Sequence, residues 1–250
     1  MRIDIITLFP EMCEAVLSES IIGRARESGA VQINCHQLRE FAFDKHRRVD
    51  DAPYGGGKGM LMMAEPIALC FEDICKQTGT RPHFVFMSPQ GKTLTQNRLK
   101  ELSQLDNICV LCGHYEGVDQ RLIDEFVDEQ ISIGDYVLTG GEIPACIVVD
   151  CVARMIDGVL ASPECYEEES ISSGLLEYPQ YTRPVEFHGK RIPDVLLSGD
   201  HEKVARWRYD ASVERTKQKR PDLLENGIPP YEFRRSETYG THLTKQPEPK

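Results

Sequence analysis

The sequence predicts an α/β fold with a mostly parallel sheet, followed by a smaller, mainly helical domain. Short apolar runs alternate with helical patterns over the first 158 residues, and this alternation is typical of a parallel sheet with helices on both faces. With 250 residues and 40% hydrophobic side chains, the chain can form one large domain or two unequal ones. No apolar run approaches the roughly 20 residues that cross a bilayer. The residues alone favour a doubly wound open sheet, because knotted chains are rare.

Strands are predicted where β-rich apolar runs end at proline, glycine or polar clusters. The first run is stopped by Phe9 and Pro10. The expected strands cover residues 2–8, 31–38, 83–88, 107–112 and 130–133. Helices are predicted from apolar residues at helical spacing, and Pro66 lies in the first turn of one of them, where its missing N–H costs little. The expected helices cover the stretch after Pro10 up to residue 27, and residues 65–78, 94–105, 118–127 and 142–158.

Two irregular stretches divide the chain. Residues 39–59 are polar, contain four glycines and are long for a loop, which points to a functional role. Residues 159–173 are acidic and serine-rich, as interdomain linkers often are. We therefore expect a first domain at 1–160, a linker at 161–173 and a second domain at 174–250 that ends in a loose tail.

The net charge of −11 conceals an asymmetry along the chain. Residues 1–173 carry 15 Lys and Arg against 28 Asp and Glu, whereas residues 174–250 carry 14 against 12. A basic C-terminal helix on an acidic body is compatible with a polyanionic partner, and a solvated helix face is the alternative. If the partner is RNA, we expect Arg215, Lys217 and Lys219 to contact it.

The cysteines and the N-terminus indicate the compartment. Nine cysteines, an odd number, are scattered mostly in apolar runs, which favours reduced core thiols over a disulfide framework. The first residues lack the charged and then apolar build of a signal peptide, so we expect a cytoplasmic protein.

Three glycine-bearing loops, at 88–91, 113–117 and 133–142, follow predicted strands. Ligands of open α/β sheets bind at the carboxyl ends of strands, and none of these loops is basic, so a nucleoside without phosphates such as S-adenosylmethionine fits them. Turn formation alone is the alternative explanation of the glycines. The glycine-rich stretch 54–59 lacks the first glycine and the Ser or Thr of a phosphate loop, which disfavours an ATP- or GTP-dependent enzyme.

Five stretches of the sequence match one known family. They cover residues 50–60, 113–119, 132–142, 174–184 and 196–201. On these motifs the chain resembles the bacterial tRNA (guanine-N1)-methyltransferases, the TrmD family of the SPOUT superfamily, from residue 1 to about residue 226. The resemblance implies a deep trefoil knot at the end of the first domain, in place of the open sheet, with S-adenosylmethionine bound bent inside the knot. It also implies a homodimer, in which the C-terminal domain of one subunit faces the knot of the other, and assistance by Mg²⁺, for which no metal ligands are assigned.

The resemblance assigns the cofactor pocket to the three loops. The expected cofactor-binding residues are Met87, Ser88, Pro89, Gly113, Tyr115, Glu116, Ile133, Gly134, Asp135, Tyr136, Val137, Leu138, Gly140, Gly141 and Pro144. Glu116 is expected near the methionyl amino group or the target base, and a solvated loop carboxylate is the alternative.

The reaction that the resemblance implies is methyl transfer to N1 of the guanosine at tRNA position 37, next to the anticodon. That nitrogen carries a hydrogen, so the reaction needs a general base and a donor for the charge that develops on O6. The resemblance places the base at Glu169, where the family most often has aspartate, and the O6 donor at Arg154. The alternatives are a solvated linker acid for Glu169 and an ion pair of Arg154 with Asp150 or Asp157. A catalytically inactive RNA-binding module is the competing function, and the aspartate-to-glutamate exchange is its only support.

Overall fold

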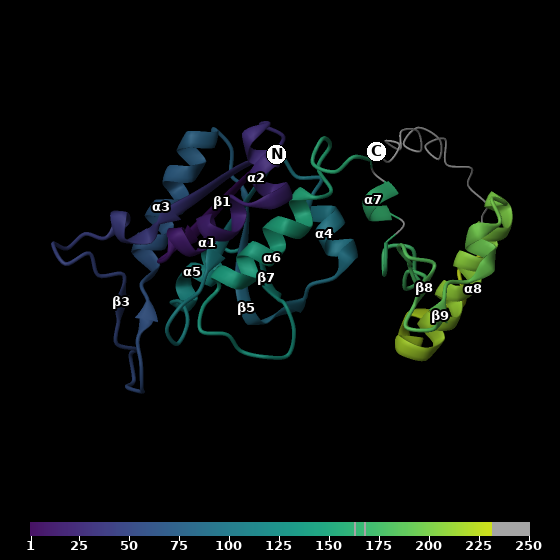
Figure 1. Ribbon diagram of the computed structural model, residues 1–250. Helices are drawn as coiled ribbons and strands as arrows, with labels where there is room; N and C mark the ends of the chain where they lie inside the picture. Colours follow the sequence, from purple (N-terminus) through teal and green to yellow (C-terminus); the bar gives the residue numbers. More distant parts are fainter. Residues whose placement is uncertain (163, 168, 232–250) are drawn as a thin grey trace. The chain divides into compact units, whose positions relative to one another are not determined.

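The computed structural model describes residues 1–231 except 163 and 168, and it divides into two compact units (Figure 1). The first unit comprises Met1–Tyr166 and the second begins at Glu167. This boundary lies inside the segment 161–173 that the sequence predicts as a linker.

The first unit contains a five-stranded parallel sheet in the order β2-β1-β6-β5-β7. Its strands are β1 (Arg2–Thr7), β2 (Gln32–Gln37), β5 (His83–Thr93), β6 (Asn107–Cys112) and β7 (Glu129–Ser132). Side chains of the central strand β6 alternate between two apolar cores: Val110 and Cys112 belong to one, and Cys109 and Leu111 to the other. The predicted α/β class with a mostly parallel sheet is confirmed.

Helices cover both faces of this sheet (Figure 1). One core is closed by α1 (Pro10–Leu17), α2 (Ser20–Glu27), α4 (Gln96–Leu102) and α6 (Glu142–Ala153). The other is closed by α3 (Ala64–Thr78), α5 (Gln120–Phe126) and the 3-10 turn η1 (Leu38–Phe41). The polar stretch after η1 includes a small antiparallel ladder of β3 (Asp50–Asp51) and β4 (Leu61–Met62).

Two elements differ from the predictions. The helix expected up to residue 27 is two helices, because Ser20 has a φ of 55° and interrupts it. The break lets both Leu17 and Ile22, five positions apart, point into the same core.

The stretch 88–91, expected as a loop, lies inside β5 as a bulge. Ile131 of β7 is the register partner of both Met87 and Lys92, so the four residues between them are extra. A Cβ at Gly91 would lie 2.5 Å from the amide nitrogen of Ile131. Only glycine therefore allows β5 to approach β7 this closely after the bulge.

The second unit is built around one long helix. Its elements are β8 (Glu186–Phe187), β9 (Lys190–Arg191), η2 (Asp194–Leu197), α8 (His201–Lys219) and η3 (Pro221–Leu224), with the short α7 (Glu164–Glu167) at the unit boundary. The carboxylate of Asp200 caps α8 by accepting the Lys203 amide hydrogen at 3.1 Å. Within the described part of the chain, no helix has the length and apolar character needed to cross a membrane.

Candidate functional site

The carboxyl ends of β1, β5, β6 and β7 meet at one edge of the sheet, where the predicted cofactor loops begin. The amide of Gly141 donates to the carbonyl of Gly113 at 2.8 Å and ties the loop after β7 to the loop after β6. At the end of β1, the Thr7 hydroxyl donates to Oε1 of Glu142 at 2.9 Å. The structure therefore brings the predicted loops together at the start of α6.

Gly113 and Gly141 lie where these loops meet, and we call this pair the glycine floor. A Cβ at Gly141 would lie 2.7 Å from the Cα of Cys112 and from the amide nitrogen of Gly113, and both are backbone atoms that cannot move aside. A Cβ at Gly113 would lie 2.8 Å from the Phe86 ring. These glycines therefore allow the loop after β7 to pack directly against the backbone at the end of β6.

The loop after β6 is held by the polar stretch near β4. The amide of Glu116 donates to the Met60 carbonyl at 3.0 Å, and the amide of Met62 donates to the Gly117 carbonyl at 2.9 Å. A Cβ at Gly59 would overlap the Glu116 side chain, so the glycine-rich stretch 54–59 packs against the expected cofactor residue. The family motif at 50–60 thus supports the loop after β6.

The bulge and the loop after β7 expose their residues to different degrees. Met87 and Ser88 are buried and Pro89 is exposed in the β5 bulge. In the loop after β7, Tyr136 is 56% exposed and Val137 is 79% exposed. The rest of the predicted set is distributed as follows: Ile133, Gly134 and Gly140 half-buried, Asp135 and Leu138 exposed, Gly141 and Pro144 buried, and Tyr115 and Glu116 exposed. The edge therefore combines a closed glycine floor with an open apolar rim.

Three residues of this site were missed by the sequence reasoning: Thr7, His114 and Glu142. Nδ1 of His114 is buried with no hydrogen-bond partner among the described residues, although the ring lies 5.1 Å from that of Phe9. An unpaired buried polar atom is costly, so Nδ1 of His114 is a candidate contact for a bound ligand or water. His114 and Glu142 lie inside the recognised stretches 113–119 and 132–142, whereas Thr7 is 135 positions away from Glu142 and carries no local signal.

Burial keeps the thiol next to the glycine floor neutral. Cys112 is fully buried at the end of β6, and this burial raises its pKa above the usual range. The thiol therefore contributes packing and not nucleophilic chemistry.

The two predicted catalytic residues belong to different units. Arg154 is the C-cap residue of α6 in the first unit, where its amide donates to the Asp150 carbonyl at 3.2 Å. Glu169 is half-buried in the second unit, and its carbonyl accepts the Ser173 hydroxyl at 3.3 Å. The structure therefore places Glu169 in an ordered turn and does not test its pairing with Arg154.

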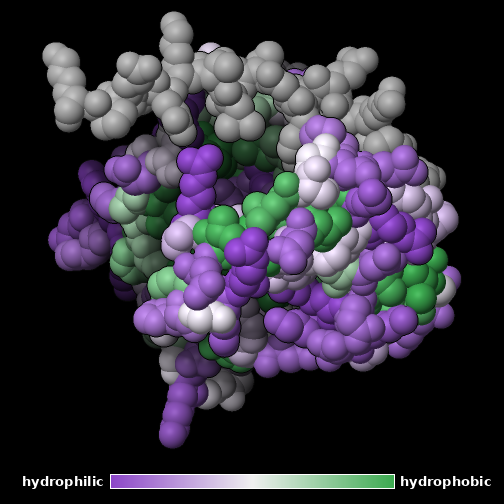
Figure 2. Space-filling model, turned by 45° about the vertical axis from the view of Figure 1, so that its right-hand side comes forward, coloured by the Kyte–Doolittle hydropathy of each residue, from purple (hydrophilic) through white to green (hydrophobic). Residues whose placement is uncertain are grey.

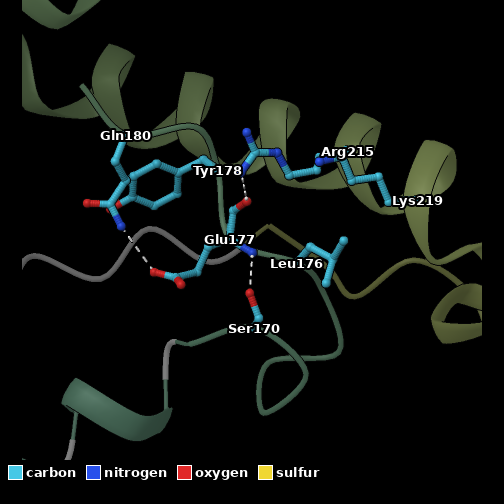
Figure 3. Close-up of a pocket in the computed structure, with 7 residues that line it drawn as sticks. All are labelled: Ser170, Leu176, Glu177, Tyr178, Gln180, Arg215 and Lys219. Carbon is cyan, nitrogen blue, oxygen red and sulfur yellow. Dashed lines mark hydrogen bonds between the residues drawn. The ribbon is translucent and has the colours of Figure 1, made fainter.

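The basic residues predicted to contact RNA all lie on α8, but they do not all face the same side of the helix. Figure 3 shows Arg215 and Lys219 on one side of a pocket of about 350 Å³, which Lys217 does not line. The remaining lining residues are Ser170, Leu176, Glu177, Tyr178 and Gln180. Residues four apart share a helix face and residues two apart do not, which explains the split.

No group of three or more His, Cys, Asp or Glu side chains that could hold a metal ion occurs among residues 1–162, 164–167 and 169–231. We therefore assign no metal ligands.

Comparison with known proteins identifies the family. The family model described as tRNA (Guanine-1)-methyltransferase TrmD matches residues 1–226. A tRNA (guanine-N(1)-)-methyltransferase of Ruminiclostridium cellulolyticum is 51% identical over 229 residues, which are 92% of this chain and 98% of that protein. A protein of the same name from Caldanaerobacter subterraneus is 53% identical over 225 residues, 90% of this chain and 92% of the relative. The chain belongs to the TrmD family of tRNA (guanine-N1)-methyltransferases.

Proposed function

We propose that this chain transfers a methyl group from S-adenosylmethionine to N1 of the guanosine at tRNA position 37. The family match over residues 1–226 carries the proposal. Relatives at about 50% identity are named tRNA (guanine-N(1)-)-methyltransferases, so the alternative of an inactive RNA-binding module has no support.

The glycine floor fits the cofactor. S-adenosylmethionine supplies an electrophilic methyl group on its sulfonium, and its adenosine carries no phosphate that would need basic residues. Gly113 is half-buried at the sheet edge, Gly141 is buried against it, and Nδ1 of His114 is a buried polar atom without a described partner. We assign the bulge of β5 and the loops after β6 and β7 to this pocket, and we include the trefoil knot in the proposal.

Two side chains carry out the proton and charge chemistry. Glu169 accepts the N1 proton of guanine, and the Arg154 guanidinium donates to O6, where negative charge develops. A glutamate in place of the commoner aspartate extends the carboxylate by one methylene, which changes its reach. The Ser173 hydroxyl holds the backbone carbonyl of Glu169 in a turn, so the difference in reach comes from the side chain alone.

A homodimer accounts for an exposed apolar surface on the first unit. Met12 and Val16 on α1 are 44% and 57% exposed, and Ile143 and Ile147 on α6 are 51% and 38% exposed. Each pair is four positions apart on one helix face, and α1 packs against α6, so the four side chains lie on neighbouring surfaces. Exposed apolar surfaces of this kind mark interfaces, and we assign the surface of Met12, Val16, Ile143 and Ile147 to a second copy of the chain. Figure 2 draws the molecule with the right-hand side of Figure 1 turned forward; on that face, hydrophilic residues in purple surround smaller groups of apolar residues in green.

Methyl transfer to unmodified tRNA, followed by nucleoside analysis, tests the function. We expect 1-methylguanosine from the parent protein. Glu169→Gln keeps the size of the side chain but cannot accept a proton, so single-turnover methylation should fall by about 10²–10⁴-fold with tRNA binding intact. Glu169→Asp is the matched control and should retain substantial activity. Parent-like turnover by Glu169→Gln would assign the base to another group. Addition of a metal chelator tests the assistance by Mg²⁺.

A further inference from the structure

The pocket of the second unit combines groups of three kinds. Arg215 and Lys219 enter it from α8, while Ser170, Glu177 and Gln180 belong to the segment that faces the helix (Figure 3). Leu176 and Tyr178 add apolar surface. Two cations, hydrogen-bonding groups and apolar surface are what one nucleotide of single-stranded RNA requires: phosphate contacts, contacts to a base edge and a surface for the base.

The charge of the Arg215 side chain is available to a phosphate. Some other basic residues of this unit pair with carboxylates: Arg206 with Asp210 at 3.2 Å and Arg220 with Asp222 at 2.6 Å. The hydrogen bond of Arg215 goes instead to the neutral carbonyl of Glu177, at 3.2 Å. This bond orients the guanidinium without neutralising it.

Hydrogen bonds connect the pocket to the proposed base. The amide of Glu177, whose carbonyl holds Arg215, donates to the Ser170 hydroxyl at 3.0 Å, and Ser170 directly follows Glu169 in the chain. The carboxylate of Glu177 accepts a hydrogen bond from the Gln180 side-chain amide at 3.2 Å, so these two polar side chains hold each other in place. The pocket residue Ser170 is therefore adjacent in the sequence to Glu169, the group that we propose acts on the target base.

We propose that this pocket is a subsite for a nucleotide adjoining the target guanosine, with its phosphate held by Arg215 and Lys219. The inference rests on the proposed function, because it takes tRNA as the substrate. It separates Lys217 from its neighbours: Lys217 adds to the general field of α8, whereas Lys219 recognises one particular phosphate.

Unmodified tRNA with a single uncharged methylphosphonate, placed in turn at each linkage flanking the target guanosine, tests this subsite. Binding is measured without S-adenosylmethionine for the parent, Lys219→Ala and Lys217→Ala. At one linkage we expect the methylphosphonate to weaken parent binding about tenfold, the usual scale of a charge-assisted contact. Lys219→Ala should weaken binding of the all-phosphate tRNA to a similar extent, and the combination should weaken it no further. Lys217→Ala should weaken binding by the same smaller factor at every linkage.

We chose Lys219 for the test because its side chain is exposed, so replacing it by alanine leaves no buried group unpaired. Arg215→Lys, which keeps the charge but loses the guanidinium fork, should show a partial loss at the same linkage. The subsite would be overturned if the affinity losses from Lys219→Ala and from the methylphosphonate multiplied at every linkage. It would also be overturned if the effect of Lys217→Ala depended on the linkage.

The outcomes also separate the subsite from the proposed function. A parent protein that forms 1-methylguanosine but shows no linkage-specific dependence overturns the subsite alone. A parent that shows the dependence but forms no 1-methylguanosine overturns the proposed function and retains the subsite.

Discussion

Gly141→Ala should damage the cofactor site far more than Gly113→Ala, although each adds one methyl group. At Gly141 the new Cβ lies 2.7 Å from two backbone atoms, whereas ordinary contact begins at 3.4 Å, so β6 and the start of α6 must separate by about 0.7 Å. That shift breaks the 2.8 Å hydrogen bond from Gly141 to Gly113. At Gly113 the nearest neighbour is the ring of Phe86, a side chain that can turn.

Overpacking of this kind costs about 1–3 kcal/mol, and the lost hydrogen bond costs about 1 kcal/mol more. For a chain of this length each kcal/mol lowers Tm by about 2–4 °C, so we expect Gly141→Ala to melt about 4–16 °C below the parent. Thermal unfolding and calorimetric titration with S-adenosylmethionine measure the two effects. Affinity should be largely lost in Gly141→Ala and only reduced in Gly113→Ala. Parent-like stability and affinity of Gly141→Ala would refute the glycine floor as the cofactor site.

Three further predictions concern stability and RNA binding. Thr216→Val removes the hydroxyl that accepts the Leu176 amide hydrogen at 2.8 Å and leaves this partly buried amide without that partner, so urea unfolding of the second unit should show a loss of about 1–3 kcal/mol, which Thr216→Ser avoids. Burial opposes ionisation of Glu129, but hydrogen bonds from His83 and Arg98 outweigh it and lower its pKa from 4.5 to about 2. The stability from this carboxylate is therefore complete above pH 4.5 and is lost as pH falls toward 2, so the gap between the parent and Glu129→Gln in urea midpoint should shrink over that window. Affinity for tRNA should fall steeply with salt, and joint alanine replacement of the three basic residues predicted on α8 should flatten this slope while cofactor affinity is unchanged; an unchanged slope would place the RNA track elsewhere.

Local patterns were sufficient for the sheet and for the edge that holds the site. Alternating strands and helices predict a parallel sheet, and in such a sheet the loops after neighbouring strands must meet at the same edge. The bulge at 88–91 could not be predicted, because proline and glycine there are equally typical of a loop. Its conformation depends on the pairing of Lys92 with Ile131, which is a contact between distant strands.

The pocket on α8 shows a second limit of sequence reasoning. Charge alone grouped Arg215, Lys217 and Lys219, since a run of basic residues does not reveal which helix face is covered. The covered face is defined by Ser212, Val213 and Thr216, all buried. Once that face is known, the helical period assigns Arg215 and Lys219 to one side of α8.

The hydrogen bonds of the second unit support the base role that we propose for a glutamate at position 169. The Leu176 amide is held by Thr216 of α8, the Glu177 amide by Ser170, and the Glu169 carbonyl by Ser173. These bonds hold the backbone from Glu169 to Glu177 and tie it to α8 through Thr216, so this segment is not a free linker. A mostly polar helix such as α8 depends on contacts of this kind for its stability. Because the backbone of position 169 is held independently of its side chain, replacing aspartate by glutamate changes the reach of the carboxylate and leaves its support unchanged.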